Sequence, residues 1–277
     1  MSDESSDALR DRLIDGVIAA GRRVMDIYRQ GFDVELKDDQ SPLTQADMAS
    51  HHALLALLNS LFPDTPVLSE ESEPVSYATR QRWKRYWLVD PLDGTKEFIK
   101  RNDEFTLNVA LVDDGVPVFG IVHAPALGED GITWWGQVDE GAFKCEGDKQ
   151  RRITVSQLPD PDHKPWRVAG SRSHGQPKLK AFCAALPAHS RISMGSSLKF
   201  CLVAEGSADL YPRLAPTSEW DSAAAQAVVV AAGGEVLEAH SLKPLRYNQQ
   251  DSLLNPFFIV CTQRDPRWQQ ALATALT

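Results

Sequence analysis

Apolar residues recur at helical spacing in two segments near the N-terminus, and the pattern then changes to short apolar runs. Spacing of three or four residues predicts an amphipathic helix over residues 7–28 that ends near Gly31. The same spacing predicts a second helix over residues 46–61, closed by Pro63. Short apolar runs predict strands at residues 67–68, 86–89, 105–112, 116–122, 132–135 and 141–145. Helices followed by a series of strands indicate an α+β arrangement.

From about Leu158 the segments alternate between strand and helix type. Strands are expected at residues 166–169, 208–211 and 235–238, and helices at residues 178–186, 196–205 and 221–232. This alternation is typical of an α/β unit. Pro159, Pro161 and Pro165 mark the change. We therefore expect an α+β domain over residues 1–157 packed on an α/β domain over residues 158–277.

Composition and charge narrow the class of protein. Over 277 residues, 43% are hydrophobic and 24% are charged, which is ordinary for a folded globular chain. The net charge of −9 disfavours a nucleic-acid groove or an anionic membrane surface as the main partner. No secretory signal or integral membrane segment is visible, so the cytoplasm is the expected compartment. Four scattered cysteines without CxxC spacing disfavour a zinc site or a disulfide framework.

The most informative local pattern is a buried strand that ends in two carboxylates, Asp90 and Asp93. Pro91 and Gly94 fix the backbone around these acids, and such rigidity suits Mg²⁺, which requires closely placed oxygen ligands. Two further acids stand at the ends of predicted elements. Glu70 follows another apolar run, and Asp221 opens an Ala-rich helix. Taken singly, each acid is equally typical of a turn or a helix start.

Two sequence segments together resemble the signatures of a known enzyme family. They read Trp-Leu-Val-Asp-Pro-Leu-Asp-Gly-Thr-Lys-Glu-Phe over residues 87–98, and Trp-Asp-Ser-Ala-Ala over residues 220–224 followed by Gly233-Gly234. The family is that of the lithium-sensitive, magnesium-dependent phosphatases, which includes inositol monophosphatase, fructose-1,6-bisphosphatase and the 3′-phosphoadenosine 5′-phosphate phosphatases. The resemblance implies a layered α-β-α-β-α sandwich of the sugar-phosphatase type.

The resemblance also implies a set of metal ligands and a catalytic pair. Glu70, Asp90 and the Leu92 carbonyl would hold one Mg²⁺, and Asp90, Asp93 and Asp221 a second; Glu70 would also help to hold a third. In the family a Thr and an Asp activate the attacking water, and these correspond here to Thr95 and Asp47. From the sequence alone, Asp47 is more typical of an acid in the first turn of a helix.

Segments in the second half indicate the substrate. Gly-Ser-Arg-Ser-His over residues 170–174, the Gly195–Cys201 helix start and Tyr211-Pro-Arg213 are similar to the bacterial 3′(2′),5′-bisphosphate nucleotidase subgroup of the family. That similarity implies phosphate contacts by Ser196, Lys199 and Arg213, with His174 near the nucleotide and Gly94, Thr95 and Asp221 also at the substrate. Singly, these residues are typical of a helix cap, a solvated lysine and a surface arginine. Asp103 stands where close relatives often carry Gly, so a slightly different loop is expected there.

The expected activity is hydrolysis of the 3′-phosphate of adenosine 3′,5′-bisphosphate to AMP and phosphate by metal-activated water, in sulfur metabolism. An inositol or sugar monophosphatase is the alternative within the family. A non-catalytic nucleotide sensor is a third hypothesis, which retention of Thr95 and the acids disfavours. The resemblance further implies lithium sensitivity, and for some relatives peripheral association with the cytoplasmic face of the inner membrane. A monomer and a homodimer both remain open.

Overall fold

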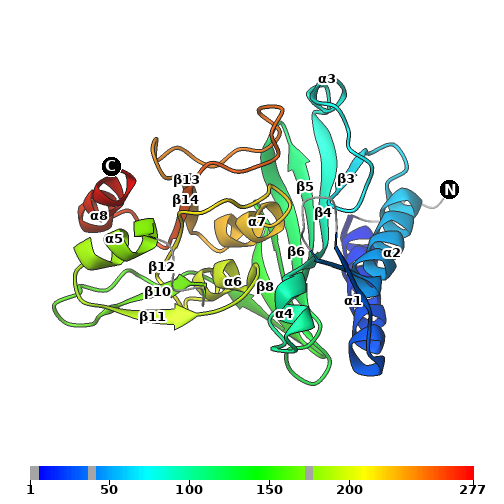
Figure 1. The fold of residues 1–277 in the computed structure, drawn as a ribbon, viewed down its shortest axis with the longest axis horizontal. Helices are drawn as coiled ribbons and strands as arrows, with labels where there is room; N and C mark the ends of the chain where they lie inside the picture. The colour runs from blue at the N-terminus through cyan, green and yellow to red at the C-terminus, as the bar shows by residue number, and fades with distance from the viewer. Residues whose placement is uncertain (1–5, 37–41, 172–176) are drawn as a thin grey trace.

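The helices and strands alternate in an α-β-α-β-α stack (Figure 1). This computed structural model describes residues 6–36, 42–171 and 177–277. Helices α1 (Ser6–Gln30) and α2 (Gln45–Leu61) form one outer layer, and α5 (Pro177–Ala185) and α8 (Pro266–Leu276) form the other. Two sheets lie between them, separated by α6 (Leu198–Ala204) and α7 (Ala223–Ala231). The layered sandwich expected from the sequence is confirmed.

The first sheet has the strand order β3-β4-β5-β6-β7-β8-β9. Strand β3 runs parallel to β4, and each later neighbour is antiparallel. The strands are β3 (Val67–Ser69), β4 (Arg85–Asp93), β5 (Thr106–Asp113), β6 (Val116–Ala124), β7 (Ile132–Gln137), β8 (Gly141–Glu146) and β9 (Lys149–Ile153). Short helices α3 (Tyr77–Arg80) and α4 (Thr95–Ile99) flank β4, and β1 (Val34–Leu36) pairs with β2 (Pro42–Thr44).

The second sheet has the order β11-β10-β12-β14-β13, with parallel and antiparallel neighbours. Its strands are β10 (Trp166–Gly170), β11 (His189–Ser193), β12 (Leu210–Arg213), β13 (Glu235–Glu238) and β14 (Phe258–Cys261). Three of these strands, β10, β12 and β13, overlap those expected from the apolar runs. The division into two domains at residues 157 and 158 stays a prediction.

Helix α7 packs unusually close to the first sheet, and this contact sets the position of the acid that precedes it. A Cβ added at Gly120 on β6 would lie 2.1 Å from the Ala224 carbonyl oxygen, far inside van der Waals contact. Only glycine allows this approach. Small residues on the helix contribute as well, because most of α7 is alanine and valine and is buried between the sheets.

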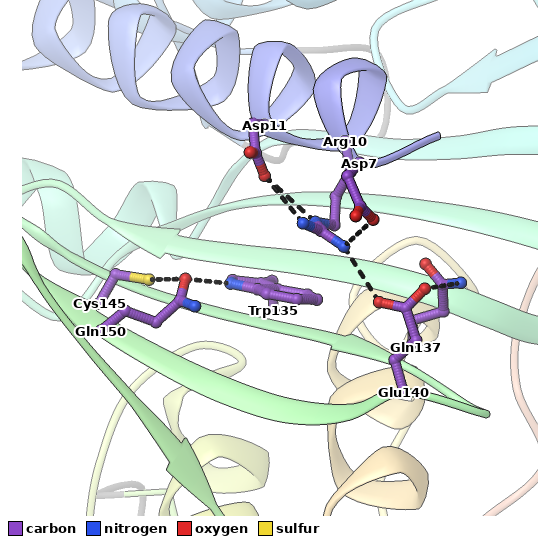
Figure 2. A network of polar contacts seen from close by, with 8 residues as sticks. All are labelled: Asp7, Arg10, Asp11, Trp135, Gln137, Glu140, Cys145 and Gln150. Carbon is purple, nitrogen blue, oxygen red and sulfur yellow. Dashed lines mark hydrogen bonds and ion pairs between the residues drawn. The ribbon is translucent and has the colours of Figure 1, made fainter. Parts of the chain in front are cut away.

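A polar network on the far side of the first sheet ties α1 to β7 and β8 (Figure 2). The Arg10 guanidinium bonds Asp7 at 2.9 Å and Glu140 at 3.0 Å, and it lies 4.9 Å from the centre of the Trp135 ring. On the other side of that ring, Trp135 Nε1 donates to Gln150 at 3.2 Å. The network therefore ties the start of α1 to the face of the first sheet that lies away from the second sheet.

Several element boundaries differ from the sequence prediction for local physical reasons. Strand β4 does not stop at Asp90 but continues to Asp93, with a register shift against β5 between the two acids. Helix α6 begins at Leu198 because Ser196 has a positive φ of 41°, outside the helical region. Helix α7 begins at Ala223, so Asp221 lies in the preceding turn and not in the helix. Within the described residues, no helix has both the length and the apolar character needed to span a membrane.

Candidate active site

Three carboxylates from two layers meet between the sheets. Asp90 and Asp93 lie at the end of β4, and Asp221 lies in the turn before α7. One oxygen from each lies within 4.8 Å of the others, and among the described residues these three make up the acidic group. Glu70 follows β3, where its N–H donates to the Val89 carbonyl at 3.1 Å. Its charge acts on the cluster, although its carboxylate is outside the 4.8 Å group.

The backbone between Asp90 and Asp93 is held by local hydrogen bonds. The Leu92 N–H donates to Asp90 Oδ1 at 3.0 Å, and Ser50 Oγ donates to the Pro91 carbonyl at 2.7 Å. Gly94 then adopts a φ of 94°, which favours glycine, and turns the chain into α4. The expected rigidity around the two acids is present.

The electrostatics of the cluster call for a cation. Asp90 is 1% exposed, and burial raises its pKa well above the usual value; the nearby charges of Glu70, Asp93 and Asp221 raise it further. Burial, followed by the same kind of repulsion, also raises the pKa of Asp221. In addition, Asp90 Oδ2 is buried without a hydrogen-bond partner among the described residues. An oxygen-only donor set with an orphaned carboxylate oxygen fits a hard divalent cation.

Asp47 and Thr95 contact each other beside this cluster. Thr95 Oγ1 lies 3.2 Å from Asp47 Oδ1 and 3.3 Å from the Leu92 carbonyl oxygen. The other Asp47 oxygen caps α2, accepting from the Thr44 N–H at 2.7 Å and the Thr44 hydroxyl at 2.6 Å. Burial raises the pKa of Asp47, whereas these hydrogen bonds lower it. Both interpretations of Asp47, helix-start acid and partner of Thr95, are therefore compatible with one conformation.

A pocket of about 170 Å³ opens next to Asp93 and Asp221. It brings together residues from α4, β12 and the segment before α6. The lining residues are Asp93, Gly94, Glu97, Ser171, Gly195, Ser196, Lys199, Phe200, Tyr211, Arg213, Thr217 and Asp221. His174, also predicted at the substrate, lies outside the described residues.

The two cations of the pocket are held in different ways. Lys199 is 4% exposed, and its Nζ donates to the Ser196 carbonyl and to the Met194 carbonyl at 3.3 Å. Burial lowers the pKa of Lys199 to about 8. Arg213 donates from Nε to the Thr217 hydroxyl and from Nη2 to the Pro216 carbonyl at 2.7 Å. Lys199 is thus a buried cation, in contrast to the solvated lysine that the sequence alone suggests.

Comparison with known families identifies this arrangement. The model of the inositol monophosphatase family matches residues 8–276. The chain belongs to the inositol monophosphatase family. Among curated members, the 3′(2′),5′-bisphosphate nucleotidase CysQ of Escherichia coli K12 is 48% identical over 243 residues, which is 87% of this chain and 94% of that protein. The protein of the same name from Haemophilus influenzae is 37% identical over 251 residues, 90% of this chain and 91% of that protein.

Solved structures agree with this assignment. CysQ from Bacteroides thetaiotaomicron, described as a bacterial member of the inositol monophosphatase family, superposes with a TM-score of 0.78 at 42% identity, covering 91% of this chain and 97% of that chain. An IMPase from Thermotoga maritima superposes with a TM-score of 0.76 at 23% identity, covering 95% and 96%, and shows the shared fold.

Some residues of this family member's site carried no signal in the sequence. Thr217 lines the pocket but resembles an ordinary surface residue in the sequence, and Glu97 also lines it, although the resemblance assigns no role to this residue within the segment 87–98. Asn108 lies in the middle of β5, where its side chain donates to Ser197 at 2.9 Å. Asn108 lies directly opposite Asp90 in the sheet because of the strand register, which cannot be read from the sequence.

Proposed function

We propose that this chain is a magnesium-dependent 3′(2′),5′-bisphosphate nucleotidase that hydrolyses the 3′-phosphate of adenosine 3′,5′-bisphosphate to AMP and phosphate. The relatives that carry this name, at 37% and 48% identity over most of the chain, support the activity. The observation that carries the proposal is the position of the buried acidic cluster, which shares a pocket with Lys199 and Arg213. A cation site and fixed positive charges side by side suit a substrate with two phosphates.

In this proposal Glu70, Asp90 and the Leu92 carbonyl hold one Mg²⁺, and Asp90, Asp93 and Asp221 hold a second. Glu70 contributes to a third where one is bound. The Mg²⁺ ions, when bound, offset phosphate charge and lower the pKa of the attacking water. The carboxylates of the chain would fix the positions of the Mg²⁺ ions. Repulsion among these carboxylates in the metal-free site favours cation binding.

Thr95 and Asp47 orient the attacking water. Because the Thr95 hydroxyl donates to Asp47 Oδ1 at 3.2 Å, its oxygen is left to accept a hydrogen bond from water. The water oxygen then forms a bond to phosphorus while the bond from phosphorus to the 3′ oxygen breaks. The attacking water gives up one proton, and the 3′ oxygen takes up a proton in turn and leaves as the 3′ hydroxyl of AMP.

The second phosphate lies against the other wall of the pocket. Lys199 supplies a buried charge there, and the bonds of Arg213 to Thr217 and Pro216 hold its guanidinium at the pocket. Ser196 and Gly94 complete this wall, and His174 is proposed near the nucleotide. An inositol monophosphate carries one phosphate and would leave these cations without a partner.

A phosphate-release assay with Mg²⁺ tests the activity. We expect adenosine 3′,5′-bisphosphate to be hydrolysed with a higher kcat/KM than inositol 1-phosphate or fructose 1,6-bisphosphate. The reverse preference would reject the nucleotide assignment in favour of a sugar-phosphate monophosphatase, and release from none of them would favour a nucleotide sensor. Inhibition by Li⁺ is expected in the same assay.

A cytoplasmic location is also proposed, and it is supported by four cysteines that form no disulfide.

A further inference from the structure

Ser197 touches two of the clustered acids at once. Its N–H donates to Asp93 Oδ2 at 2.6 Å. Its hydroxyl oxygen lies 2.9 Å from the same carboxylate oxygen and 2.7 Å from the Asp221 carbonyl oxygen. Asp93 belongs to the first sheet and Asp221 to the turn before α7. Ser197 therefore links the two layers at the point where their carboxylates approach each other.

Asn108 limits the directions in which the Ser197 hydroxyl can donate. Asn108 Nδ2 donates to Ser197 Oγ at 2.9 Å, so one lone pair of that oxygen is occupied. The hydroxyl hydrogen then has two acceptors, Asp93 Oδ2 and the Asp221 carbonyl. Ser197 is 1% exposed and Asn108 is fully buried, so bulk water does not compete for these bonds. The Asn108 side chain thus holds the Ser197 hydroxyl between the two acidic residues.

Burial of Asn108 has an energetic cost that its place in the sheet does not explain. Asn108 Oδ1 has no hydrogen-bond partner among the described residues. A buried polar group left without a partner costs about 1–3 kcal/mol, and an apolar side chain of similar shape would avoid that cost in mid-strand. Among the described residues, the hydrogen bond to Ser197 is the contact that an apolar side chain could not make.

We infer that Asn108 and Ser197 form a positioning pair that sets the distance between Asp93 and Asp221, and with it the affinity for Mg²⁺. Two like charges within 4.8 Å repel each other, and without a tie between the layers the metal-free acids would move apart. Ser197 holds Asp93 through its N–H, and its single hydroxyl hydrogen is shared between Asp93 Oδ2 and the Asp221 carbonyl oxygen. The pair acts through the acids. This inference rests on the Mg²⁺ site of the proposed function.

Isothermal titration of the free protein with Mg²⁺ tests the inference without turnover. Ser197→Ala removes the hydroxyl and keeps the N–H bond to Asp93, and it should weaken Mg²⁺ binding about 10- to 100-fold, as loss of groups that orient metal ligands does. Ser197→Thr keeps a hydroxyl and should restore most of the affinity. Asn108→Leu should weaken binding in the wild-type background but add little to Ser197→Ala, because it acts through that hydroxyl. At saturating Mg²⁺, kcat should change much less than the dissociation constant.

Thr133→Val is the matched control. It removes another buried hydroxyl from the same sheet, one that contacts His123 at 2.9 Å, and it should leave Mg²⁺ affinity unchanged. Wild-type Mg²⁺ affinity in Ser197→Ala, or an equal loss in Thr133→Val, would overturn the positioning role alone. A wild-type protein that binds no Mg²⁺ would overturn both this role and the metal site of the proposed function. Mg²⁺ binding without bisphosphate hydrolysis would reject only the proposed activity.

Discussion

Substitutions around Asp47 can separate helix capping from catalysis, because its two oxygens have different partners. Oδ2 accepts from both Thr44 donors at the start of α2, and Oδ1 accepts from Thr95. Thr44→Ala removes the capping hydroxyl and leaves the Thr95 contact in place. Thr95→Val removes the Thr95 hydroxyl that contacts Asp47 and leaves the capping hydroxyl of Thr44 in place. Asp47→Asn removes the negative charge that accepts hydrogen bonds from both Thr44 and Thr95.

The two threonine variants are expected to differ in turnover. Loss of a helix-capping hydroxyl costs about 0.5–2 kcal/mol, so Thr44→Ala should lower the free energy of unfolding by that amount while kcat stays close to wild type. Thr95→Val keeps the cap of α2, and its cost in stability is that of one hydrogen bond to the buried Asp47 carboxylate, about 1–3 kcal/mol. It removes the hydroxyl proposed to orient water, and general-base groups contribute about 10²–10⁴-fold, so kcat should fall in that range. Asp47→Asn should show both losses.

Two measurements on the wild type and the three single variants test this: urea unfolding, and phosphate release at saturating Mg²⁺ and substrate. The double variant Thr95→Val with Asp47→Asn should be no slower than the slower single variant, because the two residues act as a unit. Unchanged turnover in Thr95→Val would refute the proposed mechanism. A loss of kcat in Thr44→Ala as large as that in Thr95→Val, with the fold intact, would show that turnover depends on the start of α2.

Other predictions follow from the pocket, the metal site and the loop before β5. Because burial lowers the pKa of Lys199 to about 8, its charge is lost as pH rises through that value; KM for the bisphosphate should then increase, and Lys199→Met should flatten this pH profile. Arg213→Met should lower kcat/KM for adenosine 3′,5′-bisphosphate about tenfold or more but change that for 3′-AMP little, since 3′-AMP lacks the second phosphate. Mg²⁺ at about 100 times its Kd should stabilise the protein by about 2.7 kcal/mol for each ion bound, measured by thermal unfolding. The gain should be smaller at low pH, where protons compete for the acids whose pKa is raised. Asp103 has a φ of 65° and accepts a hydrogen bond from the Tyr28 hydroxyl at 2.8 Å. Asp103→Gly and Asp103→Ala both lose this bond. Asp103→Ala should lower the free energy of unfolding in urea by about 1 kcal/mol more, because alanine disfavours positive φ.

The class of fold and the chemical character of the site could be predicted from the amino-acid sequence. Periodicity is a local property, so the long helices α1 and α2 and the main strands of the first sheet could be predicted from spacing. Asp90 and Asp93 lie three residues apart on a backbone restricted by Pro91 and Gly94, and this part of the site is also local. Glu70 and Asp221 lie at the ends of predicted elements, but only the resemblance to a family assigns them to the same site, because chain spacing cannot show that they meet.

Long-range packing and strand register bring the distant residues of the site together. Strand register places Asn108 opposite Asp90, and the packing of α7 on Gly120 brings the Asp221 turn to the end of β4. The positive φ of Ser196, which delays α6, gives no sequence signal in a serine. Burial is likewise a property of the whole fold. A lysine that spacing alone assigns to solvent therefore becomes, as Lys199, a buried cation with a lowered pKa beside the acids.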